Sequence, residues 1–253
     1  MSVLKREKNK KKQRYYRKNY VTLVIILLLL TVMTFYFLLF TDFFNIETIE
    51  ILDNDTVTKE EILLKSGLKD GQSIFRFNKG QVLKSIEKIP YIKNASLVRV
   101  FPNKIKIYIN ERRVISAFFY ESKFLYVDDG EIILEYAEDL RETNIPIITI
   151  SSESIGSVLV GNQVQLQPEW IKKHLFTILK LFKDEEILKY ISEINITKDN
   201  VLHMYTKGGS IIKVKTSDRI VEKLDFIRTY LMEKDERMII DLTHSGNPTY
   251  IPR

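Results

Sequence analysis

The sequence LVRVFPNKIKIYIN at residues 97–110 contains the pattern that decides the fold of the first folded region. Two runs rich in β-branched residues, Leu97–Phe101 and Ile105–Asn110, are separated by Pro-Asn-Lys, which is typical of a turn. In the second run, isoleucine alternates with polar or tyrosine residues, so the three isoleucines share one face of a strand. The stretch therefore predicts two neighbouring strands with one buried face.

A strand and two helices are predicted ahead of this pair of strands. Ile49 and Ile51 alternate with a polar residue, as in a half-buried strand. Thr-Lys-Glu-Glu at 58–61 is a capping box that begins a helix, and Gly67 suits the left-handed residue that follows its end. A second helix is predicted from Asn78 to the proline at 90. The order strand, helix, helix, strand, strand fits a small sheet with two helices on one face.

An uncharged apolar run lies further toward the N-terminus. No residue in 19–41 is charged, and 21–40 is mostly Leu, Ile, Val and Phe. As a helix rising 1.5 Å per residue, 19–41 would extend about 34 Å, enough to cross a hydrocarbon core of about 30 Å. A cleaved signal peptide usually has a shorter apolar region and a small-x-small cleavage site, which residues 40–44 do not offer. We therefore expect an uncleaved transmembrane helix.

The tail ahead of that run, residues 1–18, is strongly basic. It contains nine Lys or Arg residues against one Glu, while the whole chain has a net charge of only +6, so the rest of the chain is acidic on balance. This disfavours nucleic-acid binding by the folded part. The positive-inside rule places the tail in the cytoplasm and the residues after 42 outside. The residues expected to set topology and contact anionic lipid are Lys10, Lys11, Lys12, Arg14, Arg17 and Lys18. The alternative is a tail that binds a specific cytoplasmic partner.

Residues 113–253 predict a second, sheet-rich region. Asp-Asp-Gly-Glu at 128–131, between two apolar runs, is a hairpin signal. Apolar residues at helical spacing predict one helix that opens at Pro168 and another through 220–231, with a three-stranded meander between them. Met238–Leu242 is a short apolar strand, and a polar end containing Gly and Pro follows it.

The sequence contains no recognisable set of catalytic or metal-binding residues. The three histidines, at 174, 203 and 244, are not in ligand spacing, and the absence of cysteine excludes disulfides and thiolate metal sites. Asp128-Asp129 belongs to a turn, and Gly208-Gly209 lacks the surrounding motif of a phosphate-binding loop. We therefore expect no enzymatic activity, no cofactor and no metal.

Several short pieces follow one another in a set order directly after the apolar run. They are FNIETIEI at 44–51, TKEEI at 58–62, GQSIF at 71–75, IPYIKNA at 89–95, VRVFPNKI at 98–105 and Glu111-Arg112. In this order they resemble the FtsQ/DivIB family of bacterial cell-division proteins. The resemblance implies an α+β chain, with the basic tail at 1–18, one transmembrane helix at 19–41, a POTRA domain (β-α-α-β-β) at 43–112 and a mixed α+β, sheet-rich β-domain at 113–253.

The resemblance also implies a function. The chain would be a non-enzymatic scaffold of the division complex in the inner membrane at the septum. It would hold two small single-pass coiled-coil proteins, FtsL and FtsB/DivIC, and help to regulate septal peptidoglycan synthesis. Strand addition to an exposed sheet edge is the expected mechanism, with residues 237–243 as the edge. The expected partner-binding residues are Ile239, Ile240, Asp241, Leu242, Thr243 and Tyr250. The alternatives are a membrane-anchored extracytoplasmic enzyme and a POTRA-type chaperone or sensor.

Overall fold

The structure, a computed structural model, describes residues 20–37, 41–197, 199–234 and 236–252. Within these residues one helix, Tyr20–Phe37, is long and apolar enough to cross a membrane, with a mean hydropathy of 2.4. All its side chains are exposed, which suits a helix surrounded by lipid. It falls inside the predicted span 19–41. The predicted basic tail, including the lysines and arginines at 10–18, lies outside the described residues.

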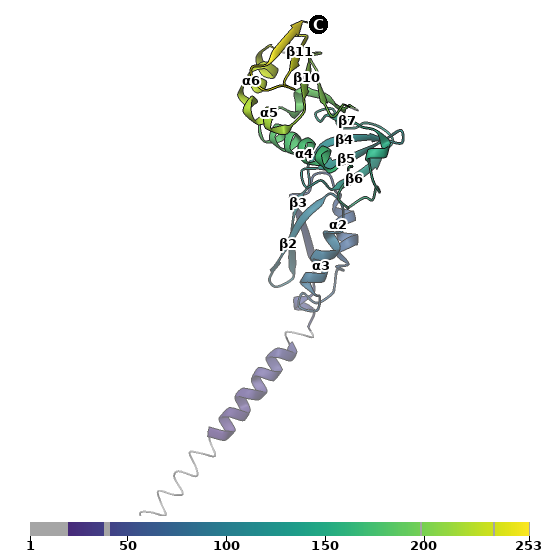
Figure 1. The fold of residues 1–253 in the computed structure, drawn as a ribbon. Coiled ribbons are helices and arrows are strands. Elements are labelled where there is room, and N and C mark those ends of the chain that lie inside the picture. Colours follow the sequence, from purple (N-terminus) through teal and green to yellow (C-terminus); the bar gives the residue numbers. More distant parts are fainter. Residues whose placement is uncertain (1–19, 38–40, 198, 235, 253) are drawn as a thin grey trace, which may run out of the picture. The chain divides into compact units, whose positions relative to one another are not determined.

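A smaller sheet has three strands in the order β1-β3-β2 (Figure 1). β1 and β3 run parallel, with Thr48 opposite Lys104 and Leu52 opposite Tyr108. Two helices lie in the chain between β1 and β2, so the predicted order of elements is confirmed. After a short 3-10 helix, η1 (Asp42–Phe44), the elements are β1 (Thr48–Leu52), α2 (Lys59–Ser66), α3 (Lys79–Ile86), β2 (Ile92–Val100) and β3 (Lys104–Glu111).

The alternation along β3 separates a buried face from an outer face. Ile105, Ile107 and Ile109 are at most 3% exposed, as predicted. On the outer face Lys104 and Lys106 reach across to Glu50 of β1, with Nζ–carboxylate distances of 2.7 and 3.2 Å. Hydrogen bonding to Lys104, and then to Lys106, lowers the pKa of Glu50. Such exposed ion pairs contribute little to stability, so the buried isoleucines dominate the stability of this strand.

Glu111, the last residue of β3, fastens the loop that follows β1. Its Oε1 accepts hydrogen bonds from the backbone amides of Asp55 and Val57, both at 3.0 Å, and its Oε2 accepts one from Thr56 at 2.8 Å. Burial by itself raises the pKa of Glu111. The hydrogen bonds from the three amides lower it, and the net result is a lowered pKa. The carboxylate therefore acts as a structural clamp in its ionised form.

The neighbouring residue, Arg112, fastens a different segment. Its Nη1 donates to Oδ2 of Asp128 at 2.7 Å, and the Asp128 side chain is fully buried. The other oxygen of Asp128 accepts the backbone N–H of Ile132 at 2.7 Å, across the turn of the predicted hairpin. Thus Asp128 is a turn residue, as the sequence indicated, and its buried charge is compensated on both oxygens.

The larger sheet has nine strands in the order β12-β11-β10-β9-β8-β7-β4-β5-β6 (Figure 1). Its β4–β7, β7–β8 and β10–β11 pairs are parallel and the others are antiparallel. The strands are β4 (Val114–Tyr120), β5 (Lys123–Asp128), β6 (Ile133–Ala137), β7 (Ile147–Thr149), β8 (Ile191–Ile196), β9 (Leu202–Thr206), β10 (Ile211–Val214), β11 (Met238–Asp241) and β12 (Thr249–Pro252). The helices that accompany them are η2 (Ser152–Ser154), α4 (Glu169–Asp184), η3 (Leu188–Tyr190), α5 (Ser217–Glu222), α6 (Leu224–Thr229) and the π-helical turn η4 (Tyr230–Lys234).

One cross-strand row of side chains runs through this sheet from edge to edge. Every member between the two end residues is fully buried. The same core contains the apolar residues that predict α4 in the sequence, Ile171, Leu175, Ile178 and Phe182. The sheet and the helices therefore share one hydrophobic layer, in which each strand contributes one residue to the row. In register, the row consists of Tyr250, Ile240, Ile212, Met204, Ile194, Ile148, Phe118, Leu125 and Tyr136.

Candidate partner-binding edge

The predicted edge strand lies inside the sheet. β11 pairs in parallel with β10 on one side and antiparallel with β12 on the other. The prediction that 237–243 forms the exposed edge is therefore wrong. The end of the chain does not leave the sheet as a polar tail, because it turns back after β11 and adds one more strand. β12, which contains Tyr250, is the edge at this end of the sheet.

Short-range hydrogen bonds hold the turn between β11 and β12. Oδ1 of Asp241 accepts from the backbone N–H of Thr243 at 2.8 Å and from its hydroxyl at 2.7 Å. Burial by itself raises the pKa of Asp241, but these two bonds, together with the charges of His244 and Lys213, lower the pKa overall. Arg219 of α5 donates to the carbonyl of Gly246 at 2.7 Å, and Gly246 has a φ of 117° that favours glycine. The turn is thus specified by side chains and fixes where β12 begins.

The residues predicted to bind a partner divide between two faces. Ile240 and Leu242 are fully buried in the core, so their side chains cannot meet a partner without unpacking the sheet. Ile239, Asp241 and Thr243 are half-buried. The sequence predicts the residues of 239–243 as one group because nothing in it distinguishes the covered face of β11 from the other face.

β12 itself is exposed along its whole length. Tyr250 and Ile251 are 46% and 52% exposed. The Tyr250 ring packs edge-on against Phe226 of α6, with a centroid separation of 5.7 Å, and Phe226 stacks on Tyr230 at 6.1 Å. Tyr250 is therefore supported by the Phe226 ring, which in turn stacks on Tyr230, while nearly half of Tyr250 stays exposed. This is the usual setting of an interface anchor.

A second apolar cross-strand row leads from the edge strand into the sheet, and its residue Ile211 is 9% exposed. Ile251 lies opposite Ile239, which lies opposite Ile211, which in turn lies opposite Tyr205. The next row is polar and includes Asp241, Lys213 and His203. Burial, followed by the charge of Lys213, lowers the pKa of His203. A strand that pairs with β12 would thus extend the apolar row that begins at Ile251, and the polar row lies beside it.

Among the described residues, no group of three or more His, Cys, Asp or Glu side chains could hold a metal ion. The predicted topology residues at 10–18 fall outside the described part of the chain. What the site offers is backbone at a free edge, one supported tyrosine and an apolar row, an arrangement suited to binding a peptide segment.

The comparisons with known proteins agree with this architecture. Residues 44–112 match the model of the FtsQ-type POTRA domain. Over 212 residues the chain is 26% identical to the cell division protein DivIB of Clostridium botulinum (strain Hall), covering 82% of each chain. The resemblance to the FtsQ/DivIB family is confirmed. The cell division protein FtsQ of Syntrophotalea carbinolica is 27% identical over 177 residues, which cover 69% of this chain and 60% of that protein.

Among solved structures, the extracytoplasmic domain of DivIB from Geobacillus stearothermophilus is similar to part of this chain. The similarity covers 49% of this chain and 97% of that one, with 15% identity and a TM-score of 0.33. The names of the FtsQ and DivIB relatives support a role in cell division for this chain. Together with the apolar helix Tyr20–Phe37, they support a single-pass membrane protein with a folded domain outside the membrane.

Proposed function

We propose that this chain is a non-enzymatic scaffold of the division complex at the septum, which holds small single-pass coiled-coil proteins of the FtsL and FtsB/DivIC type. In this proposal the basic tail is cytoplasmic and the folded residues after 42 are extracytoplasmic. By stabilising those partners the chain would help to regulate septal peptidoglycan synthesis. The family resemblance supports this role, and the geometry of the β12 edge supports its mechanism.

The observation that carries the proposal is the free edge formed by Thr249–Pro252. An edge strand offers N–H and C=O groups to an extended segment, which can continue the sheet as a tenth strand. β12 is only four residues long and ends in Pro252, features that discourage unspecific pairing of the edge. Tyr250 supplies the specific contact. Its aromatic support on Phe226 means that little side-chain entropy is lost on binding.

The test is co-purification of the two small partner proteins with the full-length chain and with two variants of the edge. A stop codon after Asn247 removes β12 but leaves β11 and the core residues Ile240 and Leu242. We expect this variant to lose capture. Tyr250→Ala should weaken capture by about 1–2 kcal/mol, roughly a tenfold loss of affinity.

Tyr136→Ala is the matched control. Tyr136 occupies the other end of the cross-strand row that ends in Tyr250, on the edge strand β6, and it is 37% exposed. It should leave capture unchanged. Circular dichroism of each variant verifies folding. Full capture by a folded chain that lacks β12, or equal losses for the two tyrosine variants, would refute the proposed edge.

A further inference from the structure

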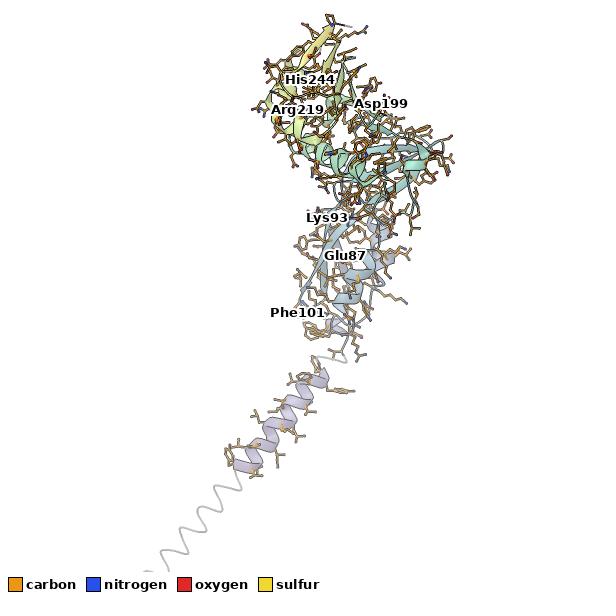
Figure 2. All side chains as sticks on the ribbon, viewed as in Figure 1. Glu87, Lys93, Phe101, Asp199, Arg219 and His244 are labelled. Carbon is orange, nitrogen blue, oxygen red and sulfur yellow. The ribbon has the colours of Figure 1, made fainter. Side chains whose placement is uncertain are left out.

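Four phenylalanines form a connected ladder in the first folded region, just after the apolar helix. The ring centroids of Phe43 and Phe44 are 4.9 Å apart, those of Phe44 and Phe75 are 5.4 Å apart, and those of Phe75 and Phe101 are 5.6 Å apart. The four rings come from three places in the sequence: η1, the loop before α3, and the turn after β2, where Figure 2 labels Phe101.

The ladder is exposed. Phe43 and Phe101 are 61% and 60% exposed, and Phe75 is 39% exposed. Exposed single phenylalanines are ordinary, but a contiguous row of aromatic rings on a small domain marks an interaction surface. Neither the core of the small sheet nor the proposed β12 edge uses these rings.

Backbone hydrogen bonds tie the ladder to the chain that leaves the helix. The N–H of Ile74 donates to the carbonyl of Phe44 at 2.9 Å, and the N–H of Gly71 donates to the carbonyl of Ile46 at 2.8 Å. In the opposite direction, the N–H of Ile46 donates to the carbonyl of Gln72 at 2.9 Å. Arg99 of β2 donates to the carbonyl of Ile74 at 2.8 Å. The Phe75 loop therefore cannot move away from Phe44 without breaking these bonds.

The position of the ladder along the chain decides what covers it. The N–H of Thr41 donates to the carbonyl of Phe37, the last described residue of the apolar helix, at 3.2 Å. Because a hydrocarbon core accommodates about twenty helical residues, a core that begins at Tyr20 ends close to Thr41. Phe43 and Phe44 follow at once, and a chain extends at most about 3.5 Å per residue. The first two rings must then lie in or beside the lipid headgroup region, and the other two rings are stacked on them.

We propose that the ladder of Phe43, Phe44, Phe75 and Phe101 is a lipid-binding surface that rests in the outer interfacial region of the bilayer. The folded domain is then held to the membrane surface by its own side chains, in addition to the helix. Aromatic rings are favoured at this depth, where the surroundings change from apolar to wet. This surface is independent of the division partners.

The test uses the full-length chain reconstituted in phosphatidylcholine vesicles. The chain has a single tryptophan, Trp170, and Trp170→Phe gives a background without tryptophan fluorescence. Phe101→Trp is then introduced, and its emission is compared in vesicles with and without bromine on the acyl chains near the headgroup. We expect quenching comparable to that of Phe37→Trp, a reference at the end of the helix.

Tyr108→Trp is the negative control. Tyr108 is 37% exposed and lies on β3, several residues beyond the turn that contains Phe101. It should show no quenching by brominated lipid. Phe75→Trp repeats the test if Phe101→Trp does not fold by circular dichroism. Emission at the ladder that is the same in brominated and plain vesicles would overturn the proposal, as would equal quenching at position 108.

Discussion

Replacing Glu111 tests the clamp that its carboxylate forms at the end of β3. Glu111→Ala removes all three acceptor contacts to the amides of 55–57. Asp55 and Thr56 are exposed, so water can replace the carboxylate there, whereas Val57 is 4% exposed and its amide loses its partner. One desolvated amide costs about 1–3 kcal/mol. We therefore expect a loss of about 2 kcal/mol of unfolding free energy.

Glu111→Gln separates the contribution of Oε1 from that of Oε2. The remaining amide oxygen can take the place of Oε1 and accept from Asp55 and Val57, but the NH₂ group then faces the N–H of Thr56, so donor meets donor. We expect a smaller loss, about 1 kcal/mol. The pKa of Glu111 is lowered in the folded state, so its contribution is present above the unfolded pKa of about 4.3 and is lost as the pH falls through the folded value. The difference between the wild type and the Gln variant should shrink in that range.

The assay is urea unfolding of the full-length chain in detergent, followed by circular dichroism, together with hydrogen exchange of the peptide that contains 55–57. Glu142→Ala, at an exposed position, is the control and should change neither reading. If Glu111→Ala unfolded like Glu142→Ala, and the amides of 55–57 kept their protection, the clamp would have no energetic role and the reasoning would fail.

Three other changes have distinct expected outcomes. Ile107→Asp should destabilise the small sheet by more than about 4 kcal/mol, because it buries an unpaired charge. Lys106→Ala, on the outer face, should cost under about 1 kcal/mol. Similar urea midpoints for the two variants would contradict the alternation of β3. Arg112→Met should cost about 3–5 kcal/mol, since it leaves the buried Asp128 charge without its cation, and Arg112→Met combined with Asp128→Asn should recover part of this loss in the same unfolding assay. Neutralising the nine basic residues of 1–18 should give mixed topology, measured by protease access to the C-terminus in spheroplasts; uniform topology would show that the tail does not orient the chain.

Much of the fold could be predicted from local patterns. β3 has a strict two-residue period, α4 has apolar residues at spacings of four, three and four, and the turn at 128–131 contains Asp-Gly. Each of these signals is complete within a few residues, so no knowledge of distant segments is needed. Element order then follows directly, and with it the POTRA arrangement.

The sequence predictions differ from the structure at elements whose bounds depend on contacts with distant residues. β2 begins at Ile92 rather than Leu97, because pairing within the small sheet extends it through the weak strand formers Asn94 and Ala95. The helix predicted through 220–231 is divided into α5, α6 and η4. β12 was missed because Gly246, Pro248 and Pro252 indicate an irregular tail, and only the turn held by Asp241 and Arg219 reveals the strand.

The partner-binding residues, too, depend on contacts that the sequence does not show. Family resemblance predicts Tyr250 as a partner-binding residue. The structure places Tyr250 on the edge strand β12, and its contact with a partner is still a prediction. Ile240 and Leu242 could not be separated from Ile239 and Asp241 without the covering helices, since an apolar strand of five residues does not show which of its faces is buried. Burial resolves that choice: the side chains of one face belong to the core.

The parallel pairing of β1 with β3 has a consequence for the order in which the chain is made. β1 is the first strand to be synthesised after the membrane helix, yet its partner, Lys104–Glu111, follows only after α2, α3 and β2. Until the ribosome has passed Glu111, the segment FNIETIEI has no strand to pair with, and the clamp on 55–57 has no carboxylate. A nascent chain halted before that point would present an open, apolar strand at the membrane surface, which is the kind of segment that chaperones and membrane proteases recognise. Completion of β3 is thus the step at which β1 first gains its pairing partner.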